Sequence, residues 1–130
     1  MTTPIFVDGV DKTTFAPFEL IDALDTKWSD IRLSFNDWNW FDETHGTDTI
    51  DDYYMNGHGL LGLVLASRAA AGLEAYPEGL EPNSEADTCY MHFSDLETAV
   101  ETARLGQEMI SDRKKLEATI IVAREHDLED

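Results

Sequence analysis

Residues 87–111, DTCYMHFSDLETAVETARLGQEMIS, change from a period of two to a helical period about a quarter of the way along. In the first part, Cys89, Met91 and Phe93 alternate with residues that would face the other way, which is typical of a half-buried strand. The SDLE motif at 94–97 then matches a capping box, in which Ser94 and Glu97 satisfy free amides at the start of a helix. This stretch therefore predicts a strand that leads directly into a helix.

Upstream of this junction, residues 30–35, DIRLSF, alternate in the same way and predict a second strand. Residues 17–25, PFELIDALD, predict a short helix with its proline in the first turn. Residues 4–7 predict a short strand that ends at the turn signal Asp8-Gly9.

Between the two predicted strands, residues 56–72 predict a helix that Asn56 caps and that ends at Gly72. Residues 76–86 contain two prolines and a glycine and predict a connecting loop. After Ser111, the chain predicts either a further helix or a continuation of the preceding one. We expect one domain over residues 1–130, with an α+β fold: a small antiparallel sheet with helices packed on one face.

Residues 35–54, FNDWNWFDETHGTDTIDDYY, contain six acidic residues, six aromatic residues and no lysine or arginine. We call them the acidic segment. Gly46 and the polar residues around it predict a turn or a longer loop inside this segment, and unstructured loops of this length are uncommon and often functional. On an extended chain Trp38 and Trp40 would share one face.

The chain as a whole has a net charge of −18, from 27 acidic and nine basic residues. This charge argues against direct binding of nucleic acid or anionic membranes, since both require a basic surface. It favours a basic protein partner, which acidic side chains would attract over a distance. Adaptation to high salt would also explain the net charge, but not why the acids gather beside tryptophans.

The candidate partner-binding residues are therefore acidic and aromatic side chains of the acidic segment together with one nearby histidine. They are Asp37, Trp38, Trp40, Asp42, Glu43, Asp48, Asp51, Asp52, Tyr53, Tyr54 and His58. Tryptophan and tyrosine are among the residues that most often contribute large binding energies at interfaces.

The sequence contains no recognisable catalytic motif, and we expect a binding protein rather than an enzyme. Cys89 and His92 are three apart on a predicted strand, so they should point to opposite faces. Asp48, Asp51 and Asp52 lie near His45 and His58, but their spacing matches neither a calcium loop nor a zinc site. We therefore expect no cofactor and no specific metal.

The same sequence predicts a cytoplasmic protein. It has a single cysteine, which fits a reducing compartment. It has no N-terminal pattern of a secretory signal, and its longest apolar run, residues 60–66, is too short to span a membrane.

The second half of the chain resembles the immunity protein 51 family of bacterial polymorphic toxin systems. The resemblance rests on the Asn56-Gly57-His58 turn before a helix, on residues 82–90, PNSEADTCY, and on the strand and helix that follow. It covers roughly residues 53–112. The family has a tryptophan shortly after the turn, where this chain has Leu60 and Leu61. The resemblance implies a small cytoplasmic α+β protein that protects its cell from a toxin.

Three functions remain open from the sequence. The first is an immunity-type inhibitor that docks on a basic toxin, such as a nuclease. The second is a nucleic-acid mimic that blocks a host defence nuclease by the same electrostatics. The third is a small enzyme or ligand-binding domain that uses acidic residues with His58 or His92 in a pocket.

Overall fold

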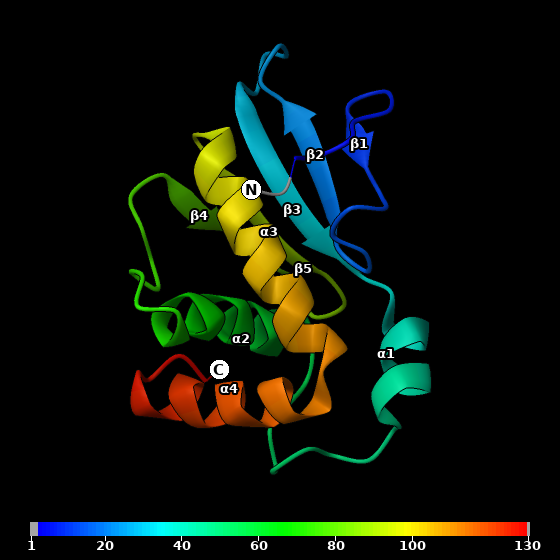
Figure 1. Cartoon of the computed structure of the whole chain (residues 1–130), viewed down its shortest axis with the longest axis vertical. Coiled ribbons are helices and arrows are strands. Elements are labelled where there is room, and N and C mark those ends of the chain that lie inside the picture. Colours follow the sequence, from blue (N-terminus) through cyan, green and yellow to red (C-terminus); the bar gives the residue numbers. More distant parts are fainter. Residues whose placement is uncertain (1–2, 130) are drawn as a thin grey trace.

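The computed structural model describes residues 3–129, which form a five-stranded sheet and four helices (Figure 1). The strands are β1 (Val10–Asp11), β2 (Glu19–Ala23), β3 (Asp30–Phe35), β4 (Leu80–Pro82) and β5 (Cys89–Phe93). The helices are α1 (Trp38–His45), α2 (Gly57–Ala70), α3 (Leu96–Ser111) and α4 (Arg113–Glu125).

The sheet is antiparallel throughout and has the order β1-β2-β3-β5-β4. Its centre is β3, in which Leu33 pairs with Leu20 of β2 on one side and with Met91 of β5 on the other. Alternate residues of β3 and β5 are buried, as their period of two predicts. The predicted α+β class and antiparallel sheet are confirmed.

α2 and α3 pack on one face of this sheet. α2 contacts β5, α3 contacts β2, β3 and β5, and α4 packs against α2 and α3 (Figure 1). Leu20, Ile31, Leu33 and Met91 point into this layer and are fully buried. The opposite face of the sheet carries Arg32, Tyr90 and other half-buried polar residues, and we call it the open face.

The helix predicted over residues 17–25 is wrong, because residues 19–23 form β2. Residues Leu20 and Ile21 fit either a helical or an extended pattern when the segment is read alone. In the folded protein every residue of β2 pairs with β3, from Glu19 opposite Ser34 to Ala23 opposite Asp30. Tertiary pairing therefore overrides the local preference of the segment.

The N-terminal prediction was right about the turn and wrong about the strand. Asp8 and Gly9 both have positive φ angles, 53° and 79°, as a tight two-residue hairpin turn requires. Val7 makes only an isolated bridge to Val10, and the regular strand β1 begins after the turn.

Helix ends follow side-chain caps, with one correction. Asn56 caps α2 by accepting from the Gly59 amide at 2.8 Å, as predicted. The cap of α3 is Asp95, which accepts from the Thr98 amide at 2.8 Å, so the predicted capping box at Ser94 is wrong by one residue. Asp112 is extended and caps α4, which makes α3 and α4 two separate helices.

The predicted loop over residues 76–86 contains the short strand β4, which pairs with β5 along one edge of the sheet. Within residues 3–129, no helix is long and apolar enough to cross a membrane.

Candidate functional site

The first half of the acidic segment forms α1, and the predicted turn or loop at Gly46 begins where this helix ends. Asp37 caps the helix by accepting from the Trp40 amide at 3.1 Å. Gly46 ends it with a φ of 82°. The helix follows directly after β3 and lies at the end of the sheet (Figure 1).

Because residues 38–40 are helical, Trp38 and Trp40 point about 200° apart and do not share a face of the helix, contrary to the prediction. Both indoles are half-buried, and both pack edge-on against Phe35, at 5.0 and 6.4 Å between ring centroids. The indole nitrogen of Trp38 also donates to the carbonyl oxygen of Asp87 at 2.8 Å. The rings therefore attach α1 to the core while part of each remains accessible.

The end of α1 is fixed by His45 and Arg113. Nε2 of His45 lies 2.6 Å from the carbonyl oxygen of Ile110, and Arg113 donates to the carbonyl oxygen of His45 at 3.0 Å. These contacts join the acidic segment to the connection between α3 and α4.

Two adjacent tyrosines of the acidic segment have opposite environments. Tyr54 is 71% exposed, whereas Tyr53 is only 2% exposed. The hydroxyl of Tyr53 donates to the carbonyl oxygen of Gly59 at 2.5 Å, inside the core. Tyr53 therefore belongs to the core. We correct its predicted role in partner binding, because its ring is buried.

A groove of about 320 Å³ lies between α1 and the loop that follows it. Its lining residues include three acids, Asp42, Asp48 and Asp52, and the aromatic residues Trp38 and Tyr54. His58 is exposed in the first turn of α2 and does not line this groove.

The carboxylates of the acidic segment are exposed at all six positions, 37, 42, 43, 48, 51 and 52. None of them makes an ion pair within residues 3–129. Arg124 approaches the segment through its backbone, because it donates to the carbonyl oxygen of Asp51 at 2.6 Å. Its hydrogen bond to Glu129, followed by the charges of Asp51 and Asp52, raises the pKa of Arg124.

Cys89 and His92 do not form a cysteine–histidine pair, because they lie on opposite faces of the sheet. Cys89 is buried on the helix side of the sheet, and burial raises the pKa of its thiol to about 12. His92 lies on the open face. Across residues 3–129, the His, Cys, Asp and Glu side chains form no group of three or more that could hold a metal ion.

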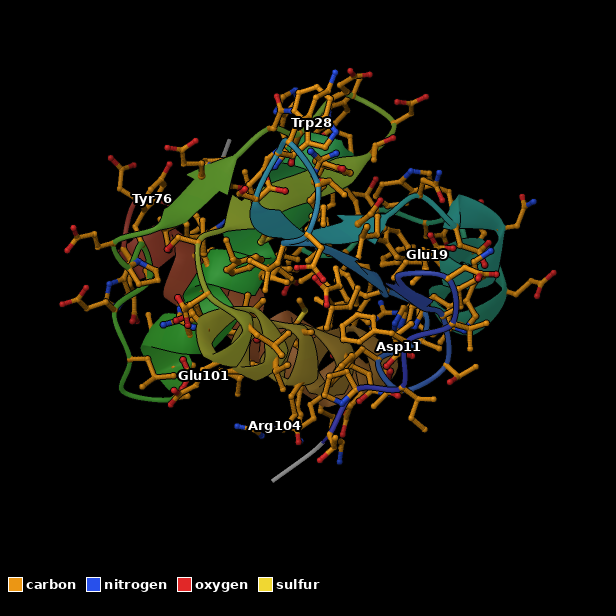
Figure 2. The ribbon with its side chains drawn as sticks, turned by 90° about the horizontal axis from the view of Figure 1, so that it is seen from above. Asp11, Glu19, Trp28, Tyr76, Glu101 and Arg104 are labelled. Atoms are coloured by element: carbon orange, nitrogen blue, oxygen red, sulfur yellow. The ribbon has the colours of Figure 1, made fainter. Side chains whose placement is uncertain are left out.

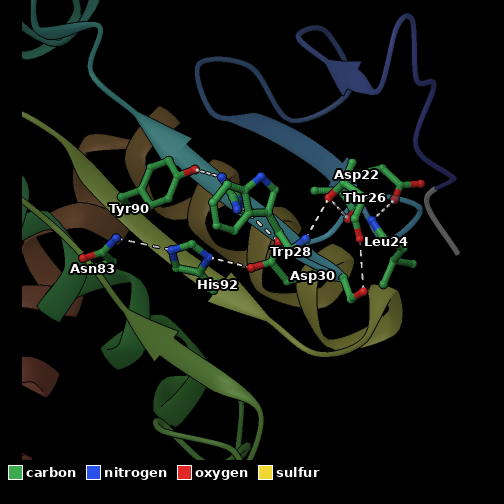
Figure 3. Close-up of polar contacts among 11 residues, drawn as sticks. Asp22, Leu24, Thr26, Trp28, Asp30, Asn83, Tyr90 and His92 are labelled. Atoms are coloured by element: carbon green, nitrogen blue, oxygen red, sulfur yellow. Dashed lines mark hydrogen bonds and ion pairs between the residues drawn. The ribbon is translucent and has the colours of Figure 1, made fainter.

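The open face carries an ordered polar network that the sequence analysis did not combine into a site (Figure 3). Asp30 accepts from Nε of Arg32 at 3.1 Å and lies 2.9 Å from Nδ1 of His92. Nε2 of His92 lies 3.3 Å from the side-chain Nδ2 of Asn83, and Arg32 donates to the Tyr90 hydroxyl at 3.4 Å. The network connects β3, β5 and the residue that follows β4.

This network stabilises the charged forms of Asp30 and Arg32. Burial raises the pKa of Asp30, but hydrogen bonds from His92 and Arg32 outweigh it, so the pKa lies below its ordinary value. Burial lowers the pKa of Arg32, but its bonds to Tyr90 and Asp30 outweigh that effect and raise it. The two side chains are therefore held as an ion pair.

Trp28, in the hairpin between β2 and β3, lies against the network, with Cζ of Arg32 5.4 Å from its ring centroid. Its side chain lies on the side of the molecule opposite Glu101 and Arg104 of α3 (Figure 2). A hollow of about 700 Å³ extends from it over the open face. The lining residues are Trp28, Asp30, Arg32, Glu81, Pro82, Asn83, Glu85, Thr88, Tyr90 and His92.

Sequence alternation already placed Arg32 opposite the core in one strand, and Tyr90 and His92 opposite it in the other. What it lacked was the pairing of β3 with β5, which brings Arg32 directly beside His92. The chain matches no protein-family model, no curated protein sequence and no solved structure. The geometry of these two surfaces is therefore the basis for a functional proposal.

Proposed function

We propose that this protein is an acidic, cytoplasmic binding protein that docks on a basic protein and neutralises it, as an immunity-type inhibitor does to a toxin. The observation that carries the proposal is the state of the acidic segment. Its six carboxylates are exposed and lack ion pairs within residues 3–129, and several of them surround a groove beside partly exposed aromatic rings.

Unpaired carboxylates on one surface repel one another, and this repulsion is relieved when a positively charged partner binds. They also accelerate the encounter with such a partner, because attraction acts before contact is made. Trp38 and Tyr54 would supply the apolar area that keeps the complex together afterwards.

A nuclease toxin fits this chemistry well, because an enzyme that holds phosphates needs a positive active site. The resemblance of residues 53–112 to the immunity protein 51 family favours a toxin as the partner, without indicating its activity. The partner to test first is a basic toxin, wherever one is encoded beside this gene.

The test compares association rates of two variants with equal net charge. Asp42→Asn, Glu43→Gln, Asp51→Asn and Asp52→Asn are combined in one variant. The control combines Glu→Gln changes at four exposed acids elsewhere, Glu74, Glu78, Glu97 and Glu108. At low salt we expect the first variant to associate about tenfold more slowly than the wild type, with a weaker dependence on salt.

We expect the control variant to lose much less, because its charges lie outside the acidic segment. Stopped-flow fluorescence measures both rates. Equal slowing of the two variants would mean that net charge alone matters, and it would refute docking through the acidic segment. An unchanged rate for the first variant would refute it as well.

A further inference from the structure

The open face is not covered by any helix in the described part of the chain, yet it is not a plain solvated surface. Arg32 lies at its centre and is held by Asp30 and the Tyr90 hydroxyl. Its neighbours come from β3, from β5 and from the residue that follows β4, and they are joined through side-chain contacts at 2.9 to 3.4 Å. The arrangement is fixed before any ligand binds, which lowers the entropic cost of binding.

Trp28 is a large aromatic side chain at the rim of this face, and it is 58% exposed. Two positive groups of the chain lie against its ring: Nζ of Lys27 at 4.6 Å and Cζ of Arg32 at 5.4 Å from the ring centroid. These distances fall within the range of cation–π attraction. The indole is therefore placed where cations are stabilised.

The carboxylates that line the hollow differ in how well they are neutralised. Asp30 already contacts both Arg32 and His92. Glu81 and Glu85 line the same hollow, are exposed, and make no ion pair within residues 3–129. Three carboxylates against the Arg32 guanidinium and the Lys27 ammonium at its rim leave the hollow negative, so it complements a cation and repels a phosphate.

We infer that this hollow receives an arginine side chain of the basic partner, stacked on Trp28 and paired with Glu81 and Glu85. The inference rests on the proposed function for the identity of the partner, but not for the chemistry of the site. Arginine suits the hollow better than lysine, because its planar guanidinium stacks on aromatic rings and pairs with carboxylates in a fork. Trp28, Arg32 and Tyr90 are also the three residue types that contribute most to protein interfaces.

In the free protein the ammonium group of Lys27 contacts the ring of Trp28, so it competes with an incoming guanidinium for that ring. It is exposed and makes no ion pair within residues 3–129, so little holds it in place. An incoming guanidinium displaces its ammonium group from the ring. Removing Lys27 should then strengthen binding, whereas removing the carboxylates should weaken it.

The probe is N-acetyl-L-argininamide, titrated into the ¹⁵N-labelled full chain at about 0.05 M salt. The Trp28 indole signal is assigned by its loss in Trp28→Phe, which alters an exposed ring. We expect a saturable shift of this signal, with a Kd on the order of 1–10 mM for so small a ligand. The matched citrulline compound has nearly the same shape without the charge, and we expect it to bind at least about fivefold more weakly.

Three variants then test the assigned roles. Glu81→Gln combined with Glu85→Gln should raise the Kd about fivefold or more, and Lys27→Ala should lower it about twofold. Lys114→Ala removes the same charge from an exposed position on α4 and should leave the Kd unchanged within error. Equal binding of citrulline, an unaltered Kd in the Glu81 and Glu85 variant, or shifts confined to the Trp38 and Trp40 indoles would each overturn the inference.

The two proposals fail separately. If argininamide does not bind while charge removal in the acidic segment still slows association with the basic toxin, the arginine site is wrong and the inhibitor role stands. If argininamide binds as expected but the toxin neither associates nor is neutralised, the arginine site stands and the inhibitor role is wrong.

Discussion

Replacing Asp11 by Asn should destabilise the protein strongly at neutral pH and hardly at all in strong acid. Asp11 is fully buried beneath the N-terminal segment, and its carboxylate accepts from the backbone amides of Ile5, Thr13 and Thr14 at 2.8 to 3.0 Å. Burial raises the pKa of Asp11, but hydrogen bonds from Thr14, Ile5 and Thr13 outweigh it and lower the pKa from 3.8 to about 2.

The size of the effect follows from this difference. A tenfold change in proton affinity is worth about 1.4 kcal/mol, so the ionised carboxylate stabilises the fold by roughly 2 kcal/mol. Because the pKa is lower in the folded chain than in the unfolded chain, this stabilisation is complete above about pH 4. It is lost as the pH falls through about 2.

Urea denaturation at a series of pH values measures the free energy of unfolding of Asp11→Asn and wild type. The control is Asp25→Asn, which removes one charge from an exposed position and so carries the same change in overall repulsion. We expect a deficit of roughly 2 kcal/mol at pH 7 for Asp11→Asn that shrinks between pH 4 and about 2, and little change for the control. A deficit that stays constant with pH, or none at pH 7, would refute this account.

Two further outcomes concern buried groups of the core. Arg68 is 3% exposed and donates to Glu101, to the Thr102 hydroxyl and to the carbonyl oxygen of Glu74. Because Arg68→Ala leaves these buried partners without their donor, it should lower the free energy of unfolding by about 3 kcal/mol. Glu101→Gln, at a half-exposed position, should cost less than about 1 kcal/mol, and chemical denaturation that gave equal losses would contradict the assigned role of the guanidinium. Because its pKa is raised to about 12, the buried Cys89 thiol should stay protonated and unreactive toward Ellman's reagent at pH 8 and react only in denaturant. Rapid reaction in the folded protein would contradict its burial.

The parts of the fold that the sequence predicted correctly are those whose pattern is local. Residues 30–35 and 89–93 alternate cleanly, and α2 has a side-chain cap at one end and a glycine at the other. The segment that became β2 has no such pattern, and its identity as a strand depends on pairing with β3. β4 has only three residues and ends in Pro82, so nothing in its composition separates it from a loop.

The candidate site also has features that the sequence indicated and features that depend on tertiary structure. The exposure of the acidic residues follows from their charge, and the sequence indicated it. The burial of Tyr53 beside the exposed Tyr54 depends on where α2 lies relative to the segment, which composition does not reveal. The network around Arg32 depends on the register between β3 and β5, and Trp28 reaches it only because a hairpin folds back over the sheet.

Close backbone contacts at α2 have a practical consequence for anyone who maps function by saturation mutagenesis. A Cβ at Gly57 would overlap the carbonyl oxygens of Glu85 and Thr88, and one at Gly59 would overlap that of Tyr54. Every substitution at these two positions should therefore score as a loss in a screen for the proposed protective function, although neither glycine has a side chain with which to touch a partner. Abundance has to be measured alongside protection, or this steric intolerance will be misread as a hotspot of recognition.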